Sequence, residues 1–385
     1  DILLEDNNIL RLNSLSVALG GMKASASGKV AGLKKELALN LKVALEKFDI
    51  KSLQGMVPIA KDYGLAGIVA GETEISGGPK SINISGKISV ENIESMQKEM
   101  ALKLDRSDLK YSGNVLNFKK PTVNFNLDMG TVEVKMPEKP KAGKPEAKKP
   151  EQEAGAVKEK PSPKVGIPPD ATVSGEIKLK KFTLQNYKIS DCSAKLDIAK
   201  SVLNLKLLSL SAYNGSMKGA FSAALTDSTL ETLKFSLDGD VKNIDIYRVI
   251  QATGVEPKGQ FYAIASGKMK LSGMGKNFSK LNGSGGVEIK DVKITDIKIM
   301  DRIASAANIP ELKETSFKAA TGTLTIEKGK VYLKNVKTDG GDKLDAFCSG
   351  NVNLVKKTQD IKGDIKFTKK YSGGDLAKYT GDAEG

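Results

Sequence analysis

Hydrophobic and polar residues alternate along most of the chain, in short stretches separated by Gly, Asn and Asp. A period of two residues places apolar side chains on one face of a β-sheet and polar side chains on the other. Many such strands, joined by tight turns, predict a largely antiparallel sheet. Clear stretches are residues 37–43, 123–127, 194–198, 287–289 and 331–334. Turn signals include Asn214-Gly215, Asp238-Gly239 and Gly340-Gly341.

The alternating pattern contains an internal duplication. Residues 37–77 align without a gap with residues 233–273, at an offset of 196 positions, and eight of the 41 aligned positions are identical. Each copy predicts a strand, a short helix that begins near an Asp, and a second strand. The identical pairs are Leu37/Leu233, Leu41/Leu237, Asp49/Asp245, Ile50/Ile246, Ile68/Ile264, Gly71/Gly267, Ser76/Ser272 and Gly77/Gly273. Such a repeat indicates that one unit is stacked along an elongated sheet.

Helix signals are few and short. We predict helices at residues 49–60, 91–100, 245–253 and 296–307. So few helices cannot cover a sheet of about twenty strands, whose apolar face must therefore close on itself, pack on another sheet, or stay open as a groove. The predicted fold class is mainly β: an elongated, repeating antiparallel sheet that forms a groove, with a few short helices.

A Pro-rich segment divides the chain. Residues 137–169 hold eight of the thirteen prolines, with Lys, Glu, Ala and Gly between them. Such a segment buries too little apolar area to offset the entropy of ordering it, so we predict a disordered linker or loop. The alternative is a segment that spans the cell wall or binds lipid headgroups. It separates an N-terminal β-rich portion of the repeating sheet, residues 1–136, from a C-terminal β-rich domain, residues 170–385.

The composition argues against catalysis. The chain contains no His, which excludes His general bases, Ser-His and Cys-His nucleophile pairs, and imidazole metal ligands. Ser-Gly-Lys occurs at residues 27–29, 85–87 and 266–268 and resembles the end of a phosphate-binding loop. Each triplet lacks the earlier Gly and the following Ser or Thr of such a loop, so we predict that these triplets begin strands. We predict no catalytic residues, no metal site and no cofactor.

The chain is basic, with a formal net charge of +14. Only four of its 60 basic residues are Arg, the residue that nucleic-acid readers favour for its planar fork. We therefore expect no nucleic-acid partner and interpret the Lys excess as a solvated sheet face, with attraction to anionic lipid headgroups as the alternative. Cys192 and Cys348 fall in predicted strands as small buried side chains, and a disulfide between them is the alternative.

The sequence contains no membrane-spanning segment, because it has no run of 18 apolar residues. It begins at Asp1 without Met, and we therefore expect a trimmed N-terminus. Any membrane anchor or targeting signal would then lie outside this chain.

Gly placement and alternation recur in a fixed order between residues 167 and 367. The segments are Pro168-Pro169 leading into 173–179 (VSGEIKL), 210–219 (LSAYNGSMKG), 264–273 (IASGKMKLSG), 281–291 (LNGSGGVEIKD), 317–331 (FKAATGTLTIEKGKV) and 348–354 (CSGNVNL). In this order they resemble the AsmA family of bacterial envelope proteins, particularly its C-terminal region. Residues 1–136 fit more loosely, as an upstream part of the same sheet.

This resemblance implies a periplasmic protein anchored to the bacterial inner membrane. It also implies a taco-like or groove-like sheet related to bridge-like lipid transfer proteins. The implied role is to move phospholipid toward the outer membrane or to support outer-membrane assembly. The anchor typical of the family is not in this chain, which is also short for bridging an envelope alone. The family brings no catalytic residues.

Two functions fit these features. The first is a groove that binds or conducts phospholipid or another acyl lipid, since acyl chains need a continuous apolar trough without specific polar contacts. The residues that line the groove are expected at inward-facing strand positions. The alternative is that these residues form an ordinary hydrophobic core. The candidates are Leu37, Leu39, Leu41, Ile177, Leu179, Leu205, Leu207, Val287, Ile289, Leu324 and Ile326. The second is an assembly factor that binds envelope proteins, by strand addition at an exposed sheet edge.

Overall fold

The computed structural model describes most of residues 2–367. Outside the described residues lie Asp1, residues 368–385 and the whole predicted linker, residues 137–169. Shorter gaps fall at residues 6–7, 34–35, 98–99, 117–119, 226–231, 254–259, 276, 297–300, 302–303, 306–309, 340–343 and 357. The predicted turn at Gly340-Gly341 and most of the predicted helix at 296–307 therefore lie outside the described residues.

The described chain forms one sheet of nineteen strands. Before the predicted linker these are β1 (Ile2–Glu5), β2 (Ile9–Leu19), β3 (Met22–Ala31), β4 (Ala38–Asp49), β5 (Ala66–Gly78), β6 (Ser81–Gln97), β7 (Met100–Leu116) and β8 (Lys120–Lys135). After it come β9 (Thr172–Leu184), β10 (Tyr187–Ala199), β11 (Val202–Ala212), β12 (Gly215–Ala224), β13 (Lys234–Asp245), β14 (Gln260–Met274), β15 (Asn282–Thr295), β16 (Thr315–Glu327), β17 (Lys330–Asp339), β18 (Leu344–Asn353) and β19 (Thr358–Phe367). The helical elements are short: η1 (Ile50–Leu53), α1 (Pro58–Asp62), α2 (Ile246–Ala252), η2 (Phe278–Lys280) and η3 (Pro310–Lys313).

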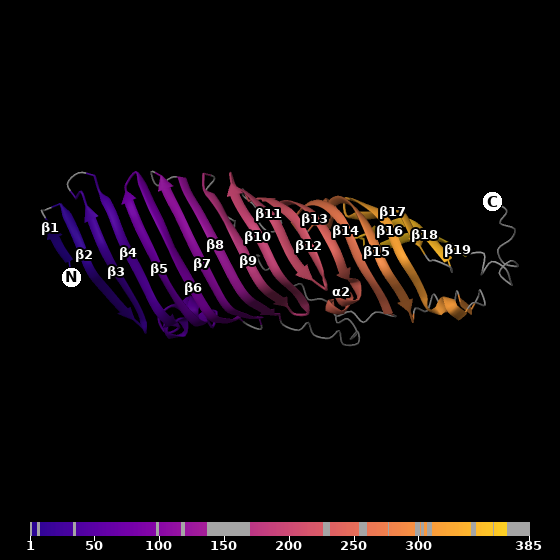
Figure 1. Cartoon of the computed structure of the whole chain (residues 1–385), viewed down its shortest axis with the longest axis horizontal. Helices are drawn as coiled ribbons and strands as arrows, with labels where there is room; N and C mark the ends of the chain where they lie inside the picture. The colour runs from indigo at the N-terminus through magenta and orange to yellow at the C-terminus, as the bar shows by residue number, and fades with distance from the viewer. Residues whose placement is uncertain are drawn as a thin grey trace, which may run out of the picture.

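Each strand pairs with its neighbours in sequence, so chain order and spatial order coincide along the elongated sheet (Figure 1). The neighbours are antiparallel, as predicted, with one exception. β8 and β9 run parallel, with Thr122 opposite Thr172 and Val134 opposite Leu184. This pair joins the strands on the two sides of the predicted linker into one sheet. The connection between them must return from one long edge of the sheet to the other.

The internal duplication is confirmed, because both copies have the same register. Leu41 lies opposite Ile75 in the β4–β5 pair, and the equivalent Leu237 lies opposite Leu271 in the β13–β14 pair. Both pairs also shift register at the equivalent place, near the end of the first strand. Because β8 and β9 are parallel, β4 and β13 run in the same direction. The helices that follow them therefore lie on the same long edge of the sheet, at the bottom of Figure 1.

An Asp begins the helix in each copy. The Asp49 carboxylate accepts a hydrogen bond from the Lys51 amide at 2.9 Å, and Asp245 accepts one from the Arg248 amide at 3.1 Å. A carboxylate at this position satisfies an amide that has no partner inside the helix. The predicted helices at 49–60 and 245–253 are thus confirmed in position, the first as two short pieces, η1 and α1.

Asp245→Ala is expected to loosen α2 without unfolding the sheet. Loss of an Asp N-cap costs about 1 kcal/mol, which corresponds to roughly fivefold faster amide exchange in the helix. Hydrogen exchange measured by mass spectrometry on peptides that cover α2 checks this. Asp238→Ala removes an exposed carboxylate of β13 and serves as the control. Equal exchange of α2 in the two variants would contradict the capping role.

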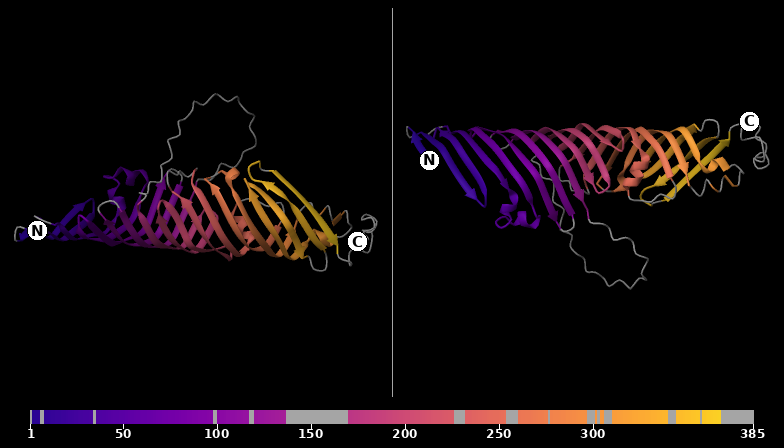
Figure 2. Two further views of the ribbon diagram at one scale, coloured as in Figure 1. Left: turned by 90° about the horizontal axis from the view of Figure 1, so that it is seen from above. Right: turned by 60° about the horizontal axis from the view of Figure 1, so that its bottom comes forward.

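Asn and Asp residues mark the places where strands bend. Asn92, Asp191, Asn243, Asp291 and Asn335 all have positive φ, between 49° and 55°, and each lies at a shift of pairing register. These are the side chains besides Gly that tolerate this conformation best. A bulge bends its strand and increases the local twist. Repeated along the sheet, the bulges curl it about its long axis, so that strand segments overlap in projection (Figure 2).

Three local predictions are wrong. Residues 91–97 belong to β6 and not to a helix, because pairing with β7 places Ile93 opposite Leu104. The Ser-Gly-Lys triplets lie inside β3, β6 and β14 and do not begin them. Asp238-Gly239 lies inside β13, where both neighbouring strands pair with it in extended conformation. The turn at Asn214-Gly215 is confirmed, with positive φ at Tyr213 and Asn214.

Candidate functional site

One row of directly paired residues crosses the sheet from β2 to β18. Residues directly opposite each other on neighbouring strands have their side chains on the same face. This spanning row consists of Leu15, Ala26, Val43, Thr73, Gly86, Tyr111, Phe125, Gly175, Leu196, Leu205, Phe221, Leu237, Leu271, Gly283, Ile326, Val331 and Val352. None of them carries a charge. The row therefore traces one continuous apolar face along the molecule.

The structure places most of the predicted lining residues on this face. Leu205 and Ile326 belong to the spanning row itself. Seven others lie an even number of residues (two, four or six) from a member of the row on the same strand, which keeps them on its face. Each of the seven is opposite apolar residues or Gly on the neighbouring strands. They are Leu39, Leu41, Ile177, Leu179, Val287, Ile289 and Leu324. Leu37 lies just before β4. Leu207 falls in the register shift between Leu205 and Leu208, and its side chain is outside the described ones.

The apolar face is not the closed core of a globular protein. Among the described residues no large side chain is completely buried, and the buried apolar residues are mostly Ala. Of the predicted lining residues with described side chains, only Ile326 is buried, at 7 % exposure, and the others are half-buried. At the N-terminal end of the face, Leu15 and Val17 are 48 % and 52 % exposed. A large exposed apolar surface of this kind is typical of a binding site for an apolar partner.

The opposite face carries the charges. Lys42 pairs with Glu74 across β4 and β5, Lys87 with Glu72 across β5 and β6, and Lys195 with Glu176 across β9 and β10. All these side chains are exposed, so each pair contributes little to stability. The predicted solvated sheet face is thus confirmed in the described part of the sheet, where its charges form cross-strand ion pairs.

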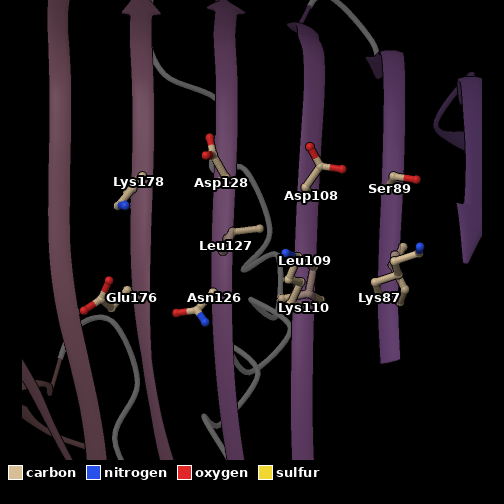
Figure 3. A pocket seen from close by; sticks show the side chains of 11 residues that line it. Lys87, Ser89, Asp108, Leu109, Lys110, Asn126, Leu127, Asp128, Glu176 and Lys178 are labelled. Atoms are coloured by element: carbon tan, nitrogen blue, oxygen red, sulfur yellow. The ribbon is translucent and has the colours of Figure 1, made fainter. Parts of the chain in front are cut away.

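The polar face also contains a depression of about 670 Å³, over β6–β9. Figure 3 shows the Lys, Asp, Glu and Asn side chains that project from these strands around it. Its rim has three basic and three acidic residues: Lys87, Lys110, Lys178, Asp108, Asp128 and Glu176. Lys87 and Glu176 already belong to ion pairs with residues outside it. Since its charges balance, this hollow has no preference for an anion or a cation, and the apolar face remains the better candidate.

Both cysteines lie on the apolar face as free thiols. Cys192 of β10 is opposite Leu179, and Cys348 of β18 is opposite Val336. The eight strand spacings between β10 and β18 put the thiols roughly 40 Å apart, far beyond the reach of a disulfide. Burial raises the pKa of both thiols above the ordinary cysteine value. The alternative of a disulfide between them is therefore wrong for this structure.

Alkylation of the two thiols is expected to need a higher pH in the folded chain than in the unfolded chain. The thiolate is the reactive form, and a raised pKa lowers its fraction at any given pH. The rate of iodoacetamide labelling, followed by mass spectrometry from pH 7 to 10 with and without urea, measures this. Identical pH profiles in the two states would show that burial does not act on these thiols.

The described residues contain no cluster of three or more Cys, Asp or Glu side chains that could hold a metal ion. None of the helices in that part of the chain is long and apolar enough to cross a membrane.

Comparison with known proteins gives one result. The sequence profile of the AsmA family matches residues 100–336, more than half of the chain. The resemblance was expected over residues 167–367, whereas the match begins at residue 100 and ends at residue 336. It therefore includes β7 and β8 and runs across the predicted linker. No curated protein and no solved structure matches the chain.

Proposed function

This chain belongs to the AsmA family, and from that premise we propose that it binds acyl lipid along the apolar face of its sheet. Membership of the family suggests a function related to the cell envelope, and the family is not known as a catalytic one. The proposed role is therefore non-catalytic binding or conduction of phospholipid. The proposed location is the periplasm, with an inner-membrane anchor outside this chain.

The continuity of the spanning row carries this proposal. Seventeen successive strands contribute an uncharged residue to it, and the face stays partly open to solvent along its length. Each CH₂ group that leaves water gains about 0.8 kcal/mol, without any need for directional contacts. At about 4.8 Å per strand, the row is roughly 75–80 Å long, whereas one acyl chain spans about half of a ~30 Å hydrocarbon core. The face therefore offers room for several acyl chains in sequence.

A second candidate function is docking of an envelope protein by strand addition. β19 pairs with only one neighbour among the described strands, so its outer edge is available for pairing. However, Asp360, Lys362, Asp364 and Lys366 alternate along this strand. Charges of alternating sign on an edge strand discourage pairing with another chain. Strand addition at the β19 edge therefore ranks below lipid binding. The opposite edge strand, β1, has no such alternation, and its Ile2, Leu3 and Leu4 are exposed.

Native mass spectrometry of the 385-residue chain, purified in mild detergent from cells that contain it, tests the proposed function. The expected spectrum shows protein carrying one or more phospholipid masses. Extraction with organic solvent should identify the same lipid in the protein fraction. A spectrum of bare protein under conditions in which a known lipid-binding protein retains its ligand would overturn the proposal.

A further inference from the structure

Two aromatic rings lie against the apolar face in the space left by glycines. Tyr111 of β7 is opposite Gly86 of β6, and Phe125 of β8 is opposite Gly175 of β9. A Cβ at Gly86 would meet the Glu72 carbonyl oxygen of the next strand, and it would also lie 2.7 Å from Tyr111 Oη and 2.9 Å from its Cζ. A Cβ at Gly175 would meet the Phe125 carbonyl oxygen, and it would also lie 2.6 Å from Phe125 Cδ1 and 2.7 Å from its Cε1. The ring atoms therefore occupy the positions that a side chain would need.

The two rings lean in opposite directions along the spanning row. Tyr111 and Phe125 are opposite each other on β7 and β8, yet Tyr111 extends over β6 and Phe125 over β9. The Tyr111 hydroxyl reaches β5, where it makes a 2.6 Å hydrogen bond with Thr73 Oγ1. A phenol that spans two strands and is fixed at its tip lies along the sheet and does not stand up from it.

The same arrangement occurs in the C-terminal half of the sheet. A Cβ at Gly273 of β14 would lie 2.8 Å from Cζ of Phe235, the residue opposite it on β13. Aromatic side chains that cover a glycine of the next strand stabilise a sheet. On this face they also have a second consequence, because a ring that lies flat leaves the space above the sheet free.

We propose that Gly86 and Gly175 are clearance residues, which keep the apolar face passable for acyl chains between β5 and β10 by letting Tyr111 and Phe125 lie flat. This inference rests on the proposed function. A side chain at either glycine would lift the ring beside it into the space where lipid lies. The two glycines thus determine how bulky an occupant the middle of the groove accepts.

Gly86→Ala is expected to weaken the binding of a phospholipid with a fluorophore on one acyl chain by about tenfold, the scale of an overpacking effect. Gly219→Ala is the matched control: its Cβ also meets a carbonyl oxygen of the next strand, but the three nearest atoms are all backbone. The control should bind like the wild type. The double variant Gly86→Ala/Tyr111→Ala should bind within about twofold of Tyr111→Ala alone, because the lifted ring is gone.

The position of the ring is measured independently with a single fluorotyrosine at position 111. Its ¹⁹F resonance should shift in Gly86→Ala and stay unchanged in Gly219→Ala, with or without lipid. Equal lipid binding by Gly86→Ala and Gly219→Ala, or no recovery in the double variant, would overturn the clearance role. Absence of lipid binding by the wild type would overturn the proposed function itself, and this inference with it.

Discussion

Leu41→Glu and Leu237→Glu are each expected to abolish lipid binding while leaving the sheet folded. These residues are equivalent in the two copies of the repeat, and both lie on the apolar face. Both side chains are half-buried in the sheet, so a carboxylate there is hydrated until lipid covers it. Bound acyl chains would remove that water, at a cost of about 3–5 kcal/mol, which weakens binding by at least about a hundredfold.

The chain offers a matched control beside each residue. Asn40 and Ser236 are the preceding residues, exposed on the polar face, and they are also equivalent in the repeat. Asn40→Glu and Ser236→Glu introduce the same charge on the other side of the sheet. Binding of the fluorescent phospholipid should be unchanged in these two variants. If all four variants lose binding equally, the effect is one of net charge or folding and the account of the apolar face fails.

Shortening the connection between β8 and β9 is expected to disrupt the sheet once the connection falls below a minimum length. The parallel register sets Thr122 opposite Thr172, and Val134 opposite Leu184. The chain that leaves β8 must therefore travel back along about twelve residues of strand, or roughly 40 Å. An extended chain covers at most about 3.3–3.6 Å per residue, so a connection shorter than about twelve residues cannot make this return.

The experiment compares connections of 20 and 8 residues, both made of Gly and Ser. The longer one should preserve the fold, because only its length is required. The shorter one should break the β8–β9 pair and expose residues 120–135 and 172–184 to protease. Limited proteolysis and far-ultraviolet circular dichroism report both effects. A protease-resistant sheet with the 8-residue connection would mean that β8 and β9 are not parallel.

The alternation of apolar and polar residues was sufficient to predict the sheet, because a period of two allows only one way to segregate the two kinds of side chain. It also placed Leu41, Ile177 and Leu324 on one face. The helix predicted at residues 91–100 is wrong because the local sequence does not reveal that residues 91–97 pair with β7. Long-range pairing overrides weak helix propensity in such a segment.

The parallel β8–β9 pair and the bulges could not be derived from alternation alone. A connection longer than about twelve residues allows β9 to run either parallel or antiparallel to β8. The bulges, however, leave a signal: an Asn or Asp inside an alternating stretch, as at Asn92 and Asn243, where the apolar phase changes. The glycines below Tyr111 and Phe125 leave none, since only the register brings them under the rings.

Photocrosslinking along the apolar face identifies what occupies it inside the cell. A photoreactive amino acid is placed at Leu41, Leu205 or Leu324, and at the polar-face neighbours Asn40, Asn204 and Thr323, in the full chain inside cells. After irradiation, mass spectrometry of the purified protein should find phospholipid adducts at the three apolar positions and none at the three controls. Protein adducts in place of lipid at the apolar positions, or lipid adducts at equal yield on both faces, would show that the apolar face is not a lipid-binding groove.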